Sequence, residues 1–275
     1  MTDRIHEFTN GGYPFPVTDE GPIDGEIIVL LHGFPQTSKS WDPVCERLNA
    51  SGYRTLTFDQ RGYTPTARPR GRRAYRMSAL VSDVGALIDA TGAPVHLVGH
   101  DWGAGVAWST AARFPDLVRT LTAVSVPHPS AFLGSMLISS QFLRSYYIGL
   151  FQISWLPEFF CRYPRLVNRM LGGTGMTTEQ IAQVQTDIID GGALTPSINW
   201  YRAMPFASPK YTRKVSAPTT YVWSTDDTAL SRRGATLCAR FVTGPYRFEI
   251  TDGSHWIPEE QPVLLHDLIV DRIKG

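Results

Sequence analysis

The segment VHLVGHDWGAGVAW, which runs from Val95 to Trp108, decides how the rest of the chain is interpreted. Its first half is a short apolar run typical of a buried strand, and its second half is rich in small residues and predicts a helix. Gly99 and Gly103 flank Asp101 at the junction. Because a very tight strand-to-helix turn needs residues without bulk on both sides, this pattern predicts such a turn with a carboxylate at its apex.

A carboxylate at this apex predicts a nucleophile. In the known form of the turn, G-x-S-x-G, a strained backbone exposes the apex serine so that it can attack a substrate. In this chain the free N–H groups at the start of the following helix would favour an ionised Asp101. The alternative is that Asp101 only caps the helix, since aspartate is a preferred capping residue. The flanking glycines and the residues described below favour the nucleophile.

Strand and helix patterns alternate along most of the chain. The predicted helices are residues 41–50, 77–90 and 103–114. The clearest predicted strands are residues 27–31, 54–58, 95–98, 121–126, 219–223 and 247–250. One or two weaker strands before Glu26 are expected to pair antiparallel at the sheet edge. The alternation predicts an α/β fold in which helices flank a mostly parallel central sheet.

The alternation stops between residues 127 and 214, where the sequence is helical, aromatic and interrupted by prolines. Thr177 and Gln180 have the spacing of a capping box and predict the start of one helix there. The sequence therefore predicts an α/β core domain formed by residues 1–126 and 215–275, and an all-helical lid formed by residues 127–214. We expect the lid to follow the sixth core strand and to cover the C-terminal edge of the sheet.

The overall composition favours a small-molecule substrate. The chain has 275 residues, of which 43% are hydrophobic and 19% charged, so it can bury a large core. Its 26 basic and 25 acidic residues give a net charge of +1, without a basic block. We therefore expect neither nucleic acid nor a membrane as a partner. A homodimer is compatible with the sequence.

Cysteine use and the apolar runs predict a soluble cytoplasmic protein. The cysteines are odd in number, far apart and without metal-ligand spacing, as expected for reduced thiols. They are Cys45, Cys161 and Cys238. The N-terminus has no apolar signal core, and the densest apolar runs, such as residues 27–31, are much too short to span a bilayer. No metal or other cofactor is predicted.

A carboxylate nucleophile restricts the chemistry. Attack on an amide or ester would form a mixed anhydride that simply reverts. Attack on an sp3 carbon that carries a strained ring or a good leaving group forms an alkyl ester with the enzyme. Water must then attack the carbonyl carbon of Asp101, and this step requires a general base and an oxyanion hole.

His255, in TDGSHWIPEE after the last predicted strand, is the predicted base because the pKa of histidine suits proton abstraction near neutrality. The other histidines lie in the N-terminal arm, within a strand, on a helical surface or in turns of their own. Asp226 and Asp227 follow the strand at 219–223, and either carboxylate could orient the imidazole.

The stretch HGFP, at residues 32–35, directly follows the first buried strand and predicts an oxyanion hole. A glycine lets the backbone approach the reacting centre, and the proline fixes the turn. The backbone N–H groups of Phe34 and Trp102 are expected to point at the developing oxyanion. The alternative is a plain strand-to-helix turn.

These motifs together resemble the epoxide hydrolases of the α/β-hydrolase superfamily. The motifs are HGFP at 32–35, DQRGY at 59–63, GHDWG at 99–103, the acid pair at 226–227 and GSHW at 253–256. The resemblance extends over nearly the whole chain and implies the α/β-hydrolase fold. It also implies that the protein adds water to a small apolar epoxide, gives a vicinal diol through an aspartyl ester, and serves detoxification.

In this family two lid tyrosines donate hydrogen bonds to the epoxide oxygen. Tyr201, within NWYR, matches one of them, and Tyr147, within SYYIGLFQ, matches the other. Tyr146 is an alternative to Tyr147, and aromatic packing of the lid helices is an alternative role for either matched tyrosine. Phe34, Trp102 and Trp155 are expected to contact the substrate in an apolar pocket.

Other activities are alternatives to epoxide hydrolysis. Haloalkane dehalogenases share the aspartate nucleophile, but they usually carry asparagine at the place of Phe34 and lack the tyrosine that matches Tyr201. Haloacetate dehalogenases carry arginines at the places of Trp102 and Gly105, so a small charged acid is disfavoured as the substrate. A non-catalytic receptor or scaffold is also disfavoured, because the nucleophile, the histidine and the acid are all present.

Overall fold

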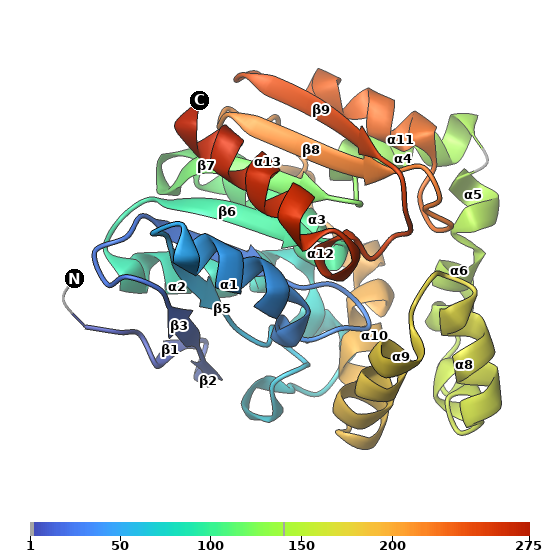
Figure 1. Ribbon diagram of the computed structural model, residues 1–275. Coiled ribbons are helices and arrows are strands. Elements are labelled where there is room, and N and C mark those ends of the chain that lie inside the picture. The colour runs from blue at the N-terminus through green and yellow to red at the C-terminus, as the bar shows by residue number, and fades with distance from the viewer. Residues whose placement is uncertain (1–2, 140) are drawn as a thin grey trace.

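The computed structural model describes residues 3–139 and 141–275 (Figure 1). Its core is a seven-stranded sheet with the strand order β3-β5-β4-β6-β7-β8-β9. β3 is antiparallel to β5 at one edge, and every other neighbouring pair is parallel, as predicted. The strands are β3 (Thr18–Glu20), β4 (Ile27–Leu31), β5 (Arg54–Thr57), β6 (Val95–His100), β7 (Val118–Val124), β8 (Thr219–Ser224) and β9 (Tyr246–Thr251).

Two further strands, β1 (Glu7–Asn10) and β2 (Tyr13–Pro16), pair antiparallel with each other and lie outside the large sheet. Pro14 and Pro16 cannot donate backbone hydrogen bonds, so β2 suits a two-stranded unit better than the interior of a sheet. For this reason the helical insertion, expected after the sixth core strand, follows β7, the fifth strand of the seven-stranded sheet along the chain.

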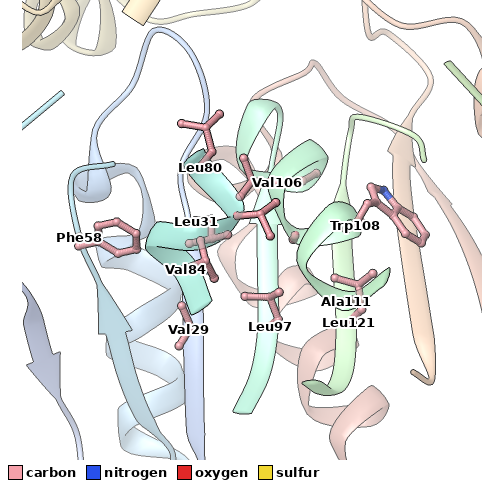
Figure 2. Packing of buried hydrophobic residues seen from close by; sticks show 14 of the residues in the cluster. Val29, Leu31, Phe58, Leu80, Val84, Leu97, Val106, Trp108, Ala111 and Leu121 are labelled. Atoms are coloured by element: carbon pink, nitrogen blue, oxygen red, sulfur yellow. The ribbon is translucent and has the colours of Figure 1, made fainter. Parts of the chain in front are cut away.

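One face of the sheet carries the larger hydrophobic core. Val29 and Leu31 point to this face and belong to the same buried cluster as residues of α2 (Met77–Thr91) and α3 (Trp102–Arg113), as Figure 2 shows. Both helices agree with the predicted ranges to within one residue at each end. Alternate residues of a strand point to opposite faces, so the neighbours of Val29 and Leu31 must pack on the other side.

The second face is covered by α1 (Asp42–Ala50) and α13 (Pro262–Lys274), which lie side by side in front of the sheet in Figure 1. Ile28 and Leu30 are fully buried on this face. Burial on both faces explains why IIVLL is apolar at every position rather than alternating.

A helical insertion joins β7 to β8. Tyr147 and Tyr201 of this insertion line the same cavities as Asp101, which follows β6, so the insertion covers the C-terminal edge of the sheet. Its α-helices are α4 (Pro129–Ile138), α5 (Gln141–Arg144), α6 (Tyr146–Gln152), α7 (Leu156–Phe160), α8 (Pro164–Gly172), α9 (Thr178–Val184) and α10 (Leu194–Arg202). α4 packs against α11 (Arg232–Leu237) of the core, and the division into two domains stays a prediction.

The capping box in the insertion is confirmed. The Gln180 amide donates to the Thr177 hydroxyl at 3.3 Å, and the Thr177 amide donates to the Gln180 side chain at 2.7 Å. The remaining short helices are α12 (Ile257–Glu260), the 3-10 helices η1 (Ser38–Trp41), η2 (Pro65–Ala67), η3 (Arg72–Tyr75), η4 (Pro115–Leu117), η6 (Met204–Phe206), η7 (Pro209–Tyr211) and η8 (Cys238–Phe241), and the π-helix η5 (Gln185–Asp190). Within residues 3–139 and 141–275, no helix has the length and apolarity needed to cross a membrane.

Candidate active site

The turn between β6 and α3 is as tight as the sequence predicts. Asp101 has a φ of 51° and a ψ of −122°, a backbone conformation that residues other than glycine rarely adopt. A Cβ atom on Gly103 would lie 2.1 Å from the Leu31 carbonyl oxygen, so only glycine fits there. A Cβ atom on Gly33 would lie 2.4 Å from the Asp101 Cβ. Backbone therefore surrounds Asp101 closely and holds its side chain in place.

The two carboxylate oxygens of Asp101 have different surroundings. Oδ1 accepts a 2.8 Å hydrogen bond from the Phe34 amide, whereas Oδ2 lies 3.4 Å from His255 Nε2. The side chain makes no capping hydrogen bond to α3, so the capping alternative is wrong. Of the two amides predicted for the oxyanion hole, that of Phe34 bonds to the carboxylate, and none of the hydrogen bonds among the described residues joins the Trp102 amide to it.

Asp101 is held in its charged form. Burial opposes ionisation, because only 8% of the residue is exposed. The hydrogen bond and positive charge of His255, with smaller contributions from His100 and the Phe34 amide, outweigh burial and lower the pKa of Asp101 below its usual value of 3.8. A buried, ionised carboxylate whose Oδ2 makes only the 3.4 Å contact with His255 has the properties of a nucleophile.

His255 contacts one of the two candidate acids. Its Nδ1 donates to Asp227 Oδ2 at 2.7 Å, and the two groups are almost completely buried. The other oxygen of Asp227 accepts hydrogen bonds from the amides of Ala229 and Leu230, which fix the carboxylate. Asp226 is exposed to solvent. The geometry therefore brings together Asp101, His255 and Asp227, and leaves Asp226 outside.

The charge of His255 depends on both neighbouring carboxylates. Burial alone would lower its pKa, but the charge and hydrogen bonds of Asp227 and Asp101 raise the pKa of His255 to about 10. A neutral Asp101 side chain would remove part of this stabilisation. The imidazole consequently becomes easier to deprotonate when Asp101 loses its negative charge.

His100 and Ser125 support His255 and were not predicted as site residues. The His255 carbonyl oxygen accepts from His100 Nε2 at 2.9 Å and from the Ser125 hydroxyl at 3.0 Å. These bonds fix the backbone from which the imidazole extends. Only the position of His100, next to Asp101 at the end of β6, could have marked it as a site residue in the sequence. Its contact with His255, 155 positions later, follows only from the fold.

Tyr147 and Tyr201 approach each other from α6 and α10. Their ring centroids are 5.9 Å apart, and the Tyr201 ring lies 5.0 Å from that of Trp102. Burial, together with the nearby charge of Asp101, raises the pKa of both phenols well above the usual 10. Both side chains therefore keep their protons at neutral pH and can act as hydrogen-bond donors. Tyr146, the alternative to Tyr147, is 65% exposed.

Contacts between lid helices hold these tyrosines in position. The Gln152 side chain of α6 donates to the Tyr201 carbonyl at 2.8 Å. Arg202, the next residue, forms a buried ion pair with Glu158 of α7 at 2.7 Å. The indole of Trp200 donates to the Arg61 carbonyl of the core at 2.8 Å. α10 is thus bonded both to the other helices of the insertion and to the loop after β5.

Asp101 lines two apolar cavities. The smaller has a volume of about 220 Å³ and is lined in part by Trp102, and the larger has a volume of about 300 Å³ and is lined in part by Phe34 and His255. Asp101, Tyr147 and Tyr201 line both. The Asp101 carboxylate and the two phenols therefore face both cavities.

The structure does not bring Trp155 to these cavities. It is 66% exposed and is not among the residues that line either of them. Trp155 precedes the five-residue helix α7 with a φ of 74°, and this local turn directs the side chain to the outer surface of the lid. The predicted substrate contact of Trp155 is not supported by its position, whereas Phe34 and Trp102 lie at the site.

Among the residues that the structure describes, no group of three or more His, Cys, Asp or Glu side chains could hold a metal ion.

Comparison with known proteins identifies the family. A family model described as the alpha/beta hydrolase fold matches residues 26–262. The chain therefore belongs to the α/β-hydrolase fold family. It is 33% identical to the AB hydrolase superfamily protein YfhM of Bacillus subtilis (strain 168), over 98% of both chains.

Epoxide hydrolases are among its relatives, as the motifs predict. The chain is 30% identical to epoxide hydrolase 4 of Homo sapiens, over 94% of this chain and 75% of the relative. The crystal structure of epoxide hydrolase A from Mycobacterium thermoresistibile superposes with a TM-score of 0.83 at 24% identity, over 98% of this chain and 97% of the other, and so supports the fold.

Proposed function

We propose that this protein is an epoxide hydrolase, which converts a small apolar epoxide to a vicinal diol through an ester with Asp101. One observation carries the proposal: the Asp101 carboxylate and the phenols of Tyr147 and Tyr201 all line both apolar cavities. The pKa directions of these groups favour a charged Asp101 and protonated phenols. An epoxide needs both a nucleophile at carbon and a donor at oxygen, because an alkoxide is a poor leaving group.

In the first step, Asp101 Oδ2 attacks one epoxide carbon and the bond from that carbon to the ring oxygen breaks. Tyr147 and Tyr201 donate hydrogen bonds to the oxygen as it becomes negative, and one of them transfers its proton. Oδ1 keeps its 2.8 Å hydrogen bond to the Phe34 amide and becomes the carbonyl oxygen of the ester.

In the second step, His255 removes a proton from a water molecule, which attacks the carbonyl carbon of the ester. Asp227 orients the imidazole and stabilises its positive charge. The Phe34 amide stabilises the negative charge that develops on Oδ1, and the Trp102 amide is the second donor expected to reach this oxygen in the intermediate. Collapse of this intermediate releases the diol and restores the Asp101 carboxylate, now with one oxygen from water.

The two steps require opposite charge states of His255. Before attack, the protonated imidazole stabilises the Asp101 carboxylate, and its pKa is about 10. Formation of the ester neutralises Asp101, so the pKa of His255 falls and the imidazolium gives up its proton, which replaces the proton that the tyrosine gave to the alkoxide. The neutral imidazole that remains is the base that the second step requires. This coupling needs no additional residue.

This coupling predicts a pH dependence of the second step. Ester hydrolysis should accelerate as the pH rises through the pKa of His255 in the ester, because only the neutral imidazole accepts a proton, and the ester should accumulate at acidic pH. Single-turnover quenching between about pH 5 and about pH 9 would measure both species. A hydrolysis rate that does not change over this range would exclude His255 as the base.

Removing the phenol hydroxyls should slow the first step. Tyr147→Phe and Tyr201→Phe keep the rings but lose one donor each, so each should slow formation of the ester on the order of 10²-fold, or about 2.7 kcal/mol in barrier. The ester should not accumulate, since the affected step precedes it. Pre-steady-state alkylation by styrene oxide measures the effect.

Tyr146→Phe is the matched control, because Tyr146 is the exposed neighbour of Tyr147, and it should alkylate at the wild-type rate. A panel of haloalkanes is tested in parallel. If both phenol variants alkylate as fast as the wild type, and the protein instead turns over haloalkanes, the dehalogenase alternative replaces this proposal.

A further inference from the structure

The outer surface of the lid is rich in exposed apolar side chains. Of the thirteen large apolar residues that are exposed in the described chain, eleven lie between Leu133 and Met170. Phe142 and Leu143 of α5 are 66% and 71% exposed, and Tyr163, before α8, is 52% exposed. α5, α6 and α8 follow one another along a single edge of the molecule, far from the N-terminal strands (Figure 1). Single exposed apolar residues are ordinary, but a concentration of this kind marks an interaction surface.

This surface is also the rim of the larger cavity. Tyr146, Leu150, Phe160 and Met170 come from three different helices, are each at least 41% exposed, and all line the cavity that contains Asp101 and His255. The apolar surface therefore continues inward to the nucleophile. We call these exposed residues of α5 to α8 the lid rim.

The lid rim carries unpaired positive charge. Arg162, Arg165 and Arg169 are exposed, and none of them forms an ion pair with a carboxylate of the described residues. Residues 141–172 contain one acidic residue, Glu158, which pairs with Arg202. The net charge of the whole chain, which is +1, does not reveal this local excess of arginine.

Two occupants would cover such a surface: a second copy of the chain or an anionic lipid surface. A two-fold dimer would place the same patch against itself and bring its three arginines close to three others. An anionic lipid surface instead accepts aromatic and apolar side chains at its boundary and attracts the arginines. Charge complementarity therefore favours lipid.

We propose that the lid rim docks on an anionic lipid surface, with Phe142, Leu143 and their apolar neighbours in the headgroup boundary and Arg162, Arg165 and Arg169 against lipid phosphates. Docking in this orientation opens the larger cavity toward the hydrocarbon. If the proposed function is correct, an apolar epoxide dissolved in the lipid reaches Asp101 without crossing water. The docking itself does not depend on the activity.

Vesicle flotation without substrate tests the docking. The wild-type protein should float with phosphatidylcholine vesicles that contain phosphatidylglycerol, bind much less to phosphatidylcholine alone, and dissociate as salt is added. The triple variant Arg162→Glu/Arg165→Glu/Arg169→Glu should bind the anionic vesicles on the order of 100-fold more weakly. Phe142→Ser/Leu143→Ser should also weaken binding.

The control is Arg47→Glu/Arg70→Glu/Arg240→Glu, which changes the net charge equally at three exposed arginines outside the lid, and should bind as the wild type does. None of these positions lines the cavities, so each variant should hydrolyse a water-soluble epoxide at the wild-type rate, which also verifies folding. The proposal is overturned if the wild type does not float, or if the control loses as much binding as the lid variant. It is also overturned if sedimentation shows that the wild type is a dimer and that the lid variants are monomers.

Discussion

Asp101→Ala should abolish epoxide turnover, with a loss on the order of 10⁶-fold, because the variant lacks the only group that the mechanism places on the substrate carbon. No ester can form, so neither a burst of product nor an alkylated protein should appear. The carboxylate oxygens contact the protein itself, at the Phe34 amide and at His255. Removing the side chain should therefore weaken substrate binding far less than it lowers the rate.

The loss of activity must be separated from loss of the fold. His255 and the Phe34 amide outweigh the cost of burying the Asp101 carboxylate, so the alanine variant should unfold at a somewhat lower temperature than the wild type but remain folded under the conditions of the assay. Intact-mass measurement after exposure to styrene oxide gives the direct readout, with Asp226→Ala as a matched control at an exposed acid. An Asp101→Ala variant that retains more than about 1% of the wild-type rate would remove the nucleophile from the mechanism.

Asp227→Asn should slow the second step rather than the first, on the order of 10⁴-fold. Asparagine keeps an oxygen for the amides of Ala229 and Leu230, so the loop should retain its shape. It removes the charge that stabilises the His255 imidazolium and disturbs the 2.7 Å hydrogen bond to Nδ1. The alkyl-enzyme should therefore form and persist.

The matched variant Asp226→Asn changes the neighbouring, exposed acid and should hydrolyse the ester at the wild-type rate. Time-resolved intact-mass measurement follows the alkylated species in both variants. Persistence of the ester in Asp226→Asn, with normal turnover in Asp227→Asn, would reverse the assignment of the acid.

The fold was largely predictable because its elements have strong local signals. The apolar run at 27–31, the glycines around Asp101 and the helical period at 77–90 each depend on contacts between near neighbours in the chain. Gly103 is the clearest example. A Cβ atom there would collide with the Leu31 carbonyl, so the glycine is required by the close contact of β4 with α3. The number of strands in the large sheet was less predictable from the sequence, because β1 and β2 pair with each other outside it.

The details of the site depended on contacts between distant residues. Asp226 and Asp227 are adjacent and chemically identical, and only the direction of the loop places one carboxylate against His255 and the other in solvent. The hydrogen bond between His100 and His255 joins the end of β6 to the loop after β9, two segments that are far apart in the chain. Trp155 resembled a pocket residue because it is aromatic, but a short helix and a left-handed backbone turned it outward.

The central claim is that the oxygen added to the substrate comes from Asp101 and not directly from water. A single turnover of styrene oxide by excess enzyme in oxygen-18 water tests this claim, with mass spectrometry of both the diol and the peptide that contains Asp101. The mechanism predicts an unlabelled diol and one oxygen-18 atom in the Asp101 carboxylate. A labelled diol from an unlabelled protein would show direct attack by water on the epoxide and would contradict the account.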